Sequence, residues 1–390
     1  MMGPPRPISL PRLAGYFLRL GALGFGGPVA LANHMRRDLV DERGWIGETE
    51  YEDGMAVATI CPGPLAYQLG VYCGYVRFGV RGALAVALAF ALAPCVIVMV
   101  FAALYTEFAG SWTVRGIFYG VAPVIVALIL KASWQLGRKT LKADPVSWLF
   151  AIAMGGVTVA LQRELAVLFI GAGLLGCLWY SRKRPAAPAP QPPAPPPPAG
   201  NAALALGGVG FQVPAAKLFV FFFKTGLLVF GSGLVIAPFL KAYVVDEYHW
   251  LTDRQFLDAV AVGMITPGPV VITATFVGYI LDGFAGGLAA TAGIFSPSVL
   301  LTIVAAPLLR RYRRNPYVQG FVQGVVAAVV GALLGTTVLV ARSAIGDTFT
   351  AVAALAALLI VLKWNKLPEP WIVLASAIAG LTAYPLLRPG

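Results

Sequence analysis

The stretch Ile60-Cys61-Pro62-Gly63-Pro64 lies inside an otherwise apolar run of the chain. A helix cannot continue through it, because each proline lacks a backbone N–H and pushes the preceding residue out of the α region. The same arrangement returns downstream as Ile265-Thr266-Pro267-Gly268-Pro269. The sequence therefore predicts two helices that are interrupted in the same way.

The similarity between these two regions extends far beyond the prolines. At a constant spacing of 205 positions, the matching pairs are Arg19 with Lys224, Gly26 with Gly231, Trp45 with Trp250, and Asp53 with Asp258. After a one-residue shift, Gly74 matches Gly278 and Gly120 matches Gly324. Such an internal repeat indicates two homologous halves. We place them at residues 1–181 and 215–390, joined by a basic and proline-rich linker at 182–214.

Composition places the chain among membrane proteins. Of its 390 residues, 58% are hydrophobic and 12% are charged, whereas globular proteins average about 25% charged residues. Several runs approach the ~20 apolar residues that span a bilayer. The net charge of +12 comes from short loops between these runs, so we assign the basic residues to membrane flanks and not to nucleic acid. We expect an all-α polytopic protein in contact with membrane lipid.

Equivalent loops of the two halves carry opposite charge. Arg310–Arg314 form a basic loop, whereas the matching loop at 106–113 contains an acid and no base. The next pair reverses the pattern, with three bases at 138–142 against one base and one acid at 342–347. Because basic loops favour the cytoplasmic side, we expect an inverted repeat, which is typical of secondary transporters. How many times the interrupted segments span the membrane stays open.

Each half contains two helix breaks, a glycine-rich one followed by a Pro-Gly-Pro. Backbone groups freed inside a membrane are tolerated only when they are buried in protein or line a water-filled cavity. A proline suits the first turn of the helix that follows a break, and the free N–H groups of that turn favour an anion. We therefore expect a substrate site for an anion, shared by both halves, at Gly26, Gly27, Pro28, Pro62, Gly63, Pro64, Gly231, Ser232, Gly233, Thr266, Pro267, Gly268 and Pro269.

Polar side chains near the breaks extend this candidate site. Arg19 and Lys224 precede the glycine breaks at equivalent positions, and a base inside a membrane is costly unless it faces the protein interior or an ion. Gln68 adds an uncharged donor. The alternative is that the breaks are packing kinks and that both bases extend to the lipid headgroups.

Two acidic residues, Asp53 and Asp258, precede long apolar segments. Helix capping explains an Asp there and contributes about 1 kcal/mol, so we favour capping over a role in proton coupling. The four cysteines lie in apolar runs and form no C-x-x-C pair. We therefore expect no disulfide, metal or other cofactor.

The combination of motifs resembles the chromate ion transporter family, in its long, two-domain form. The resemblance rests on Phe25-Gly26-Gly27-Pro28, the loop around Trp45, and Pro62-Gly63-Pro64-Leu65-Ala66. The second half departs from the pattern, because Ser232 and Gly233 stand where the first half has Gly27 and Pro28. The resemblance implies export of chromate, or a related oxyanion such as sulfate, across the cytoplasmic (inner) membrane. It also implies that the membrane potential or a proton gradient drives transport.

Two other functions are weighed beside chromate export. One is a carrier for a different anion, such as sulfate or a small organic acid. The other is an intramembrane enzyme, but the sequence has no H-E-x-x-H or G-x-S-x-G motif. It also has no Walker-type phosphate loop, which disfavours direct ATP coupling. The oligomeric state, including a homodimer, stays open.

Overall fold

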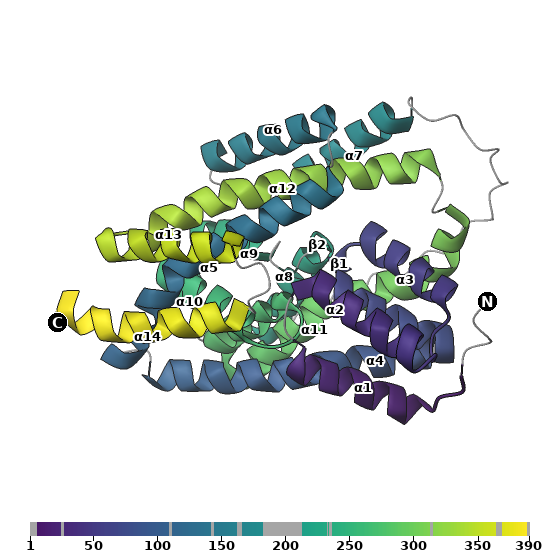
Figure 1. Cartoon of the computed structure of the whole chain (residues 1–390), viewed down its shortest axis with the longest axis horizontal. Helices are drawn as coiled ribbons and strands as arrows, with labels where there is room; N and C mark the ends of the chain where they lie inside the picture. The colour runs from purple at the N-terminus through teal and green to yellow at the C-terminus, as the bar shows by residue number, and fades with distance from the viewer. Residues whose placement is uncertain are drawn as a thin grey trace.

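The computed structural model describes residues 6–24, 27–108, 111–141, 144–161, 166–181, 213–231, 233, 236–312, 315–363 and 369–387. Helices dominate this part of the chain, so the predicted all-α class is confirmed (Figure 1). The first half contains α1 (Leu10–Leu23), α2 (Gly27–Arg36), the π-helix η1 (Arg37–Glu42), α3 (Glu48–Ile60), the short strand β1 (Gly63–Pro64), α4 (Leu65–Phe108), α5 (Trp112–Thr140), α6 (Pro145–Leu161) and α7 (Ala166–Ser181).

The second half repeats the order of the helices, including a π-helix before its proline break, but its short strand follows the first helix and not the proline break. It contains α8 (Ala215–Gly226), β2 (Phe230–Gly231), α9 (Ile236–Phe239), η3 (Leu240–Glu247), α10 (Asp253–Ile265), the 3-10 helix η4 (Val270–Ile272), α11 (Thr273–Tyr312), α12 (Pro316–Ala344), α13 (Thr348–Lys363) and α14 (Glu369–Leu387). The predicted duplication is therefore present in the structure. Most of the predicted linker, residues 182–212, lies outside the described residues.

Each of the two longest helical elements is a sharp hairpin of two helices. α4 turns at Phe78–Gly79 and α11 at Asp282–Gly283, where the two glycines have φ of 60° and 57°. Glycine adopts this left-handed conformation without a steric penalty. The arms of α11 then approach so closely that a Cβ on Gly278 would collide with the carbonyl oxygen of Gly286. The turn therefore depends on small residues on both arms.

The interrupted segments turn back on themselves. Gly24 ends α1, and a Cβ there would lie 2.6 Å from the Leu31 side chain of α2. α3 packs against the first arm of α4 in the same way, because a Cβ on Gly54 would lie 2.6 Å from the ring of Tyr72. Each interrupted segment is therefore a re-entrant hairpin that folds back on itself within the protein. Such non-helical backbone is tolerated because protein surrounds it.

Four helical elements in the described part of the chain, two of them the hairpins α4 and α11, contain a stretch long and apolar enough to cross a bilayer. They are Leu65–Phe108, Trp112–Arg138, Val270–Val304 and Pro316–Ala344. Four shorter apolar helices accompany them, at Pro145–Ala160, Leu168–Trp179, Thr348–Lys363 and Trp371–Leu386. The protein is thus a multi-pass membrane protein.

The two halves run in opposite directions. Successive turns of α6, at Ala151 and Gly155, meet successive turns of α12, at Gly331 and Gly335, so α6 and α12 are parallel. α5 is antiparallel to α6, because tryptophan rings from the two helices pack across their connection with centroids 6.0 Å apart. α5 is therefore antiparallel to α12, its counterpart in the repeat (Figure 1). This arrangement agrees with the predicted inverted repeat.

The halves are also intertwined. α6 and α7 pack along α12 of the other half, and α13 and α14 pack along α5. Glycines allow the closest approach in both places, since a Cβ on Gly324 would collide with the Ala172 carbonyl and a Cβ on Gly120 with the Ser376 carbonyl. Small residues have this role at many membrane helix interfaces. Neither half can form its complete helical packing without the other.

Candidate functional site

The proline break of the first half meets the glycine break of the second half at the centre of the molecule. β1 pairs with β2 as a short parallel ladder, with Gly63 opposite Phe230 and Pro64 opposite Gly231. The Gly63 N–H also donates a hydrogen bond of 2.5 Å to the carbonyl oxygen of Val229. Two re-entrant segments from different halves are therefore joined by backbone contacts where neither is helical.

The reciprocal contact is made on the other side of the repeat. The Gly268 N–H donates to the carbonyl oxygen of Gly24 at 2.9 Å. Gly268 matches Gly63 in the repeat, and Gly24 matches Val229. The four breaks thus meet in two reciprocal hydrogen-bonded pairs, Gly63–Val229 and Gly268–Gly24, which together we call the crossing.

Two fully buried polar side chains flank this crossing. Gly63 has φ of 141°, and a Cβ there would collide with Ser298 Oγ and lie 2.6 Å from the Gln68 amide. The Gln68 Nε2 donates to the Pro62 carbonyl at 2.5 Å. Within the described residues, Gln68 Oε1 and Ser298 Oγ have no hydrogen-bond partner. Because such groups are costly when they are buried and unpaired, the site is suited to a polar ligand.

Sequence reasoning identified Gln68 but missed Ser298. Ser298 follows Pro297 inside an apolar run, at the position that matches Cys95 after Pro94. A serine after a repeated proline was the available signal. The pairing of Ser298 with Gly63 depends on the hairpin of α11 and could not be seen in the sequence.

The remaining break residues are placed as follows. α2 begins at Gly27, with Pro28 in its first turn as predicted. Thr266, Pro267 and Pro269 are buried next to Gly268, but the Thr266 hydroxyl donates to the Val262 carbonyl of its own helix at 2.5 Å. Gly233 is buried, while Gly26 and Ser232 lie outside the described residues.

The two predicted bases are not enclosed at the crossing. Arg19 and Lys224 both have exposed side chains. Arg19 borders a hollow of about 730 Å³ between α1, α2 and η1, and this hollow extends to Gly24. Arg19 therefore lies on an approach to the crossing, whereas Lys224 lies on the exposed face of the last turn of α8.

The prediction that Asp53 and Asp258 cap helices is wrong. α3 is preceded by Gly47 and α10 by Thr252, so both carboxylates lie within the helices. Asp258 is only 2% exposed, and its Oδ2 accepts a hydrogen bond of 2.7 Å from the Tyr105 hydroxyl. Asp258 also borders a second hollow, of about 300 Å³. α10 is buried along most of its length, and Asp258 is buried with it, which sequence position alone did not indicate.

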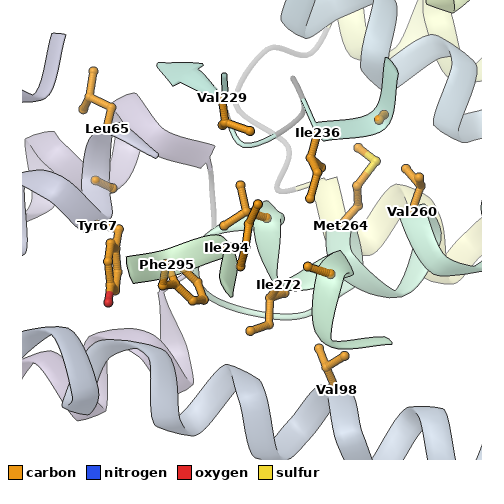
Figure 2. Packing of buried hydrophobic residues seen from close by; sticks show 14 of the residues in the cluster. Leu65, Tyr67, Val98, Val229, Ile236, Val260, Met264, Ile272, Ile294 and Phe295 are labelled. Atoms are coloured by element: carbon orange, nitrogen blue, oxygen red, sulfur yellow. The ribbon is translucent and has the colours of Figure 1, made fainter. Parts of the chain in front are cut away.

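Apolar side chains from both halves surround the crossing. Figure 2 shows Tyr67 beside Phe295, with ring centroids 4.4 Å apart, and Val229, Ile272 and Met264 nearby. This packing excludes water, and a low local dielectric strengthens any electrostatic contact made with a ligand.

Inverted, intertwined halves that meet through interrupted helices define a multi-pass membrane transport protein. The chain belongs to the chromate transporter family, whose model matches residues 11–177 and 216–381, once in each half. The expected family, the homologous halves and the assignment as a transporter and not an enzyme are thereby confirmed.

Individual relatives span nearly the whole chain. The chromate transport protein of Cupriavidus metallidurans is 43% identical over 385 residues, which cover 97% of this chain and 94% of that protein. The chromate transport protein of Pseudomonas aeruginosa is 32% identical over 396 residues, covering 98% and 94%. The uncharacterized transporter YwrA of Bacillus subtilis is 32% identical over 175 residues, which are 44% of this chain and 97% of YwrA. No solved structure matches the chain.

Proposed function

We propose that this protein is a secondary transporter that exports chromate across the cytoplasmic membrane. The names of its near full-length relatives support the substrate. The observation that carries the proposal is the reciprocal pair of hydrogen bonds between breaks of opposite halves, Gly63 to Val229 and Gly268 to Gly24. Transport sites in inverted-repeat carriers lie at such meetings of interrupted helices.

The crossing has the groups that a tetrahedral oxyanion needs. Helix starts at the breaks present backbone N–H groups with partial positive charge. Among the described residues, the Ser298 hydroxyl is a buried donor without a partner beside Gly63, and Gln68 Nε2, which donates one N–H to the Pro62 carbonyl, has a second N–H. Since Gly63 has no side chain, the Ser298 hydroxyl and the Gln68 amide approach its backbone closely.

The same geometry lets the crossing open. A hydrogen bond between backbone groups contributes about 0.5–1.5 kcal/mol net. Breaking one of the two reciprocal bonds is therefore a small cost compared with the differential binding of an ion. The two bonds are equivalent under the repeat, so opening one side or the other exposes the crossing to opposite faces of the membrane. The absence of a phosphate-loop motif from the sequence is consistent with an ion gradient or the membrane potential as driving force.

Sulfate is the main alternative substrate, because it has the same shape and charge and the donors at the crossing do not distinguish the two. Competition between chromate and sulfate for uptake identifies the preferred substrate. Chromate uptake into inverted membrane vesicles should be saturable and should depend on the membrane potential or a pH gradient. Stronger inhibition by sulfate than by unlabelled chromate would instead identify a sulfate carrier.

The site itself is tested by replacing Pro62-Gly63-Pro64 with three alanines. We expect the variant to insert into the membrane and to lose chromate uptake, because a continuous helix removes the break and its contact with Val229. Insertion is measured separately, by extraction and by protease protection. Normal uptake by a normally inserted variant would show that this break is not part of the transport site.

A further inference from the structure

The hollow beside Arg19 is lined by charged residues that are not part of the crossing. Its polar lining comes from α1, α2, η1 and the following loop, and consists of four basic residues, Arg19, His34, Arg37 and Arg43, together with Tyr16, Asn33 and Asp38. At its inner end the hollow reaches Gly24, whose carbonyl accepts the Gly268 hydrogen bond. Three guanidinium groups and one carboxylate therefore line a path that ends at the crossing.

Contacts within the hollow hold some of these groups in place. Arg37 Nη2 lies 2.9 Å from His34 Nδ1, and His34 Nε2 lies 3.3 Å from Asp38 Oδ2. The Arg43 guanidinium stacks over the ring of Trp45 at 4.7 Å. Among the described residues, no carboxylate forms an ion pair with Arg19. Arg37 Nε also lies 3.7 Å from Asp38 Oδ1 and 3.6 Å from Glu42 Oε1. Three guanidinium groups thus face two carboxylates, Asp38 in the hollow and Glu42 beside it, which leaves an excess of one positive charge.

In the second half the charge at Arg19 is kept as Lys224, but the other charges of the hollow, in α2, η1 and the following loop, are lost. At the 205-residue spacing, His34 corresponds to Phe239, Arg37 to Ala242, Asp38 to Tyr243 and Arg43 to Tyr248. Tyr243 and Tyr248 pack there with Phe221 and Trp250, and the Tyr248 and Trp250 rings are 4.8 Å apart. Because both halves form the same elements, the fold itself does not require charge at these positions. One half has a cationic hollow where the other has packed aromatic rings.

The hollow lies at the end of the molecule that carries the strongest basic loop. Arg77 donates to the Arg6 carbonyl at 3.1 Å, and the Arg6 N–H donates to Gly44, next to Arg43, at 2.7 Å. Gly79, close to Arg77, shares a separate hollow with Pro307 near the end of α11. α11 ends in Arg310, Arg311 and Tyr312, at the loop that the positive-inside rule places in the cytoplasm.

We propose that this cationic hollow is the cytoplasmic loading site for the exported oxyanion. Arg37 and Arg43 concentrate a divalent tetrahedral anion at the mouth, and Arg19 receives it next to Gly24. A cleft lined by one sign of charge raises the local concentration of its counter-ion, and the effect weakens as salt screens it. The inference rests on the proposed transport function and gives it a direction, because the aromatic cluster offers no such site on the other half.

The test compares two variants of equal charge loss at the same end of the protein. One is Arg37→Gln combined with Arg43→Gln. The matched control combines Arg36→Gln with Arg81→Gln. Both control arginines are exposed and neither lines the hollow, and Arg36 pairs with Glu48 at 2.7 Å. Chromate uptake is measured in inverted vesicles, where the cytoplasmic face is outward, and chromate exchange from the opposite face is measured in right-side-out vesicles. Retained thermal stability of each variant is a condition of the comparison.

We expect the Arg37/Arg43 variant to raise the half-saturating chromate concentration about tenfold at low salt from the cytoplasmic face only. The difference should shrink as salt is added, and the control should resemble the wild type. An unchanged half-saturation, or an equal rise from both faces or in the control, would overturn the proposal.

Calorimetric binding of chromate and of sulfate to the purified protein separates this inference from the transport proposal. Weaker binding by the Arg37/Arg43 variant supports the loading site even if wild-type vesicles move no chromate, in which case the transport proposal fails alone. Undiminished binding by that variant removes the loading site and leaves the crossing untouched.

Discussion

Gly268 donates its backbone N–H to the carbonyl oxygen of Gly24 across 2.9 Å. The two residues are far apart in sequence and belong to opposite halves of the repeat. Together with the equivalent bond from Gly63 to Val229, this contact means that each proline break is completed by the glycine break of the other half. The crossing is therefore a property of the duplicated chain and of neither half alone.

The first prediction concerns the close contact at Gly63. Gly63→Ala places a Cβ against Ser298 Oγ at a φ of 141°, so we expect a loss of about 1–3 kcal/mol in the free energy of unfolding and strongly reduced chromate uptake. Gly15→Ala is the control, because no atom lies within 4 Å of a Cβ there. Thermal unfolding in detergent and vesicle uptake measure the two effects. A Gly63→Ala variant with wild-type values in both would contradict the geometry of the crossing.

The inverted orientation makes a prediction about accessibility. Ser111 and Asn315 occupy equivalent positions and cap α5 and α12, which run antiparallel. In a cysteine-free background, Ser111→Cys and Asn315→Cys should react with a membrane-impermeant thiol reagent from opposite sides. Thr49→Cys should react from the same side as Asn315→Cys, because the neighbouring Glu50 and the end of α11 line one hollow. Labelling of positions 111 and 315 from one side would refute inversion.

Because the halves are intertwined, we expect similar losses of stability when either of two interface glycines is replaced. Gly120→Ala and Gly324→Ala each push a methyl group into the backbone of a helix from the other half, and overpacking of this kind costs about 1–3 kcal/mol. Both variants should unfold at lower temperature. Gly171→Ala is the control on α7, since a Cβ there meets no atom within 4 Å. Equal unfolding temperatures for all three would mean that the helices do not pack as described.

Asp258 tests the coupling hypothesis that remains once capping is excluded. Asp258→Ala leaves the Tyr105 hydroxyl without its acceptor and should lower the free energy of unfolding by about 1–3 kcal/mol. Asp258→Asn keeps an acceptor but cannot bind a proton, so we expect normal stability and a loss of the stimulation by an imposed pH gradient. Uptake that still responds to the gradient in the Asn variant would assign coupling to another group.

Arg19 distinguishes anion binding from headgroup contact. A guanidinium can grip two oxygens of an oxyanion at once, whereas an ammonium acts as a point charge. Arg19→Lys should therefore raise the half-saturating chromate concentration although charge is kept, and Arg19→Gln should raise it further. Lys224→Gln, at the exposed equivalent position of the second half, is the comparison. Wild-type values for both Arg19 variants would remove Arg19 from the path of the substrate.

Sequence reasoning succeeded where a local chemical rule applied. The Pro62-Gly63-Pro64 break and its copy at 267–269 follow from the missing N–H of proline, and the repeat follows from direct comparison of the halves. The opposite charge of equivalent loops predicted inversion, because positive residues resist translocation. The re-entrant course of the interrupted segments was not predictable, since hydrophobic length alone does not distinguish a helix that crosses from one that turns back.

The two acids show why a local rule can fail. Asp53 and Asp258 stand before apolar runs in the sequence, as capping residues do, but α3 and α10 begin several residues earlier. Helix boundaries depend on tertiary packing of the first turn, which a single sequence does not contain.

By itself, then, the sequence determined the class of the protein, its duplication, the positions of its breaks and the family to which it belongs, because composition, periodicity and proline chemistry act over short stretches of chain. Only the tertiary structure decided which groups meet. It paired Gly63 with Val229, placed Ser298 beside Gln68, buried Asp258 against Tyr105, and arranged Arg19, Arg37 and Arg43 around one hollow. These contacts join segments that are remote in sequence. They arise from the antiparallel packing of two intertwined halves, which no local pattern specifies.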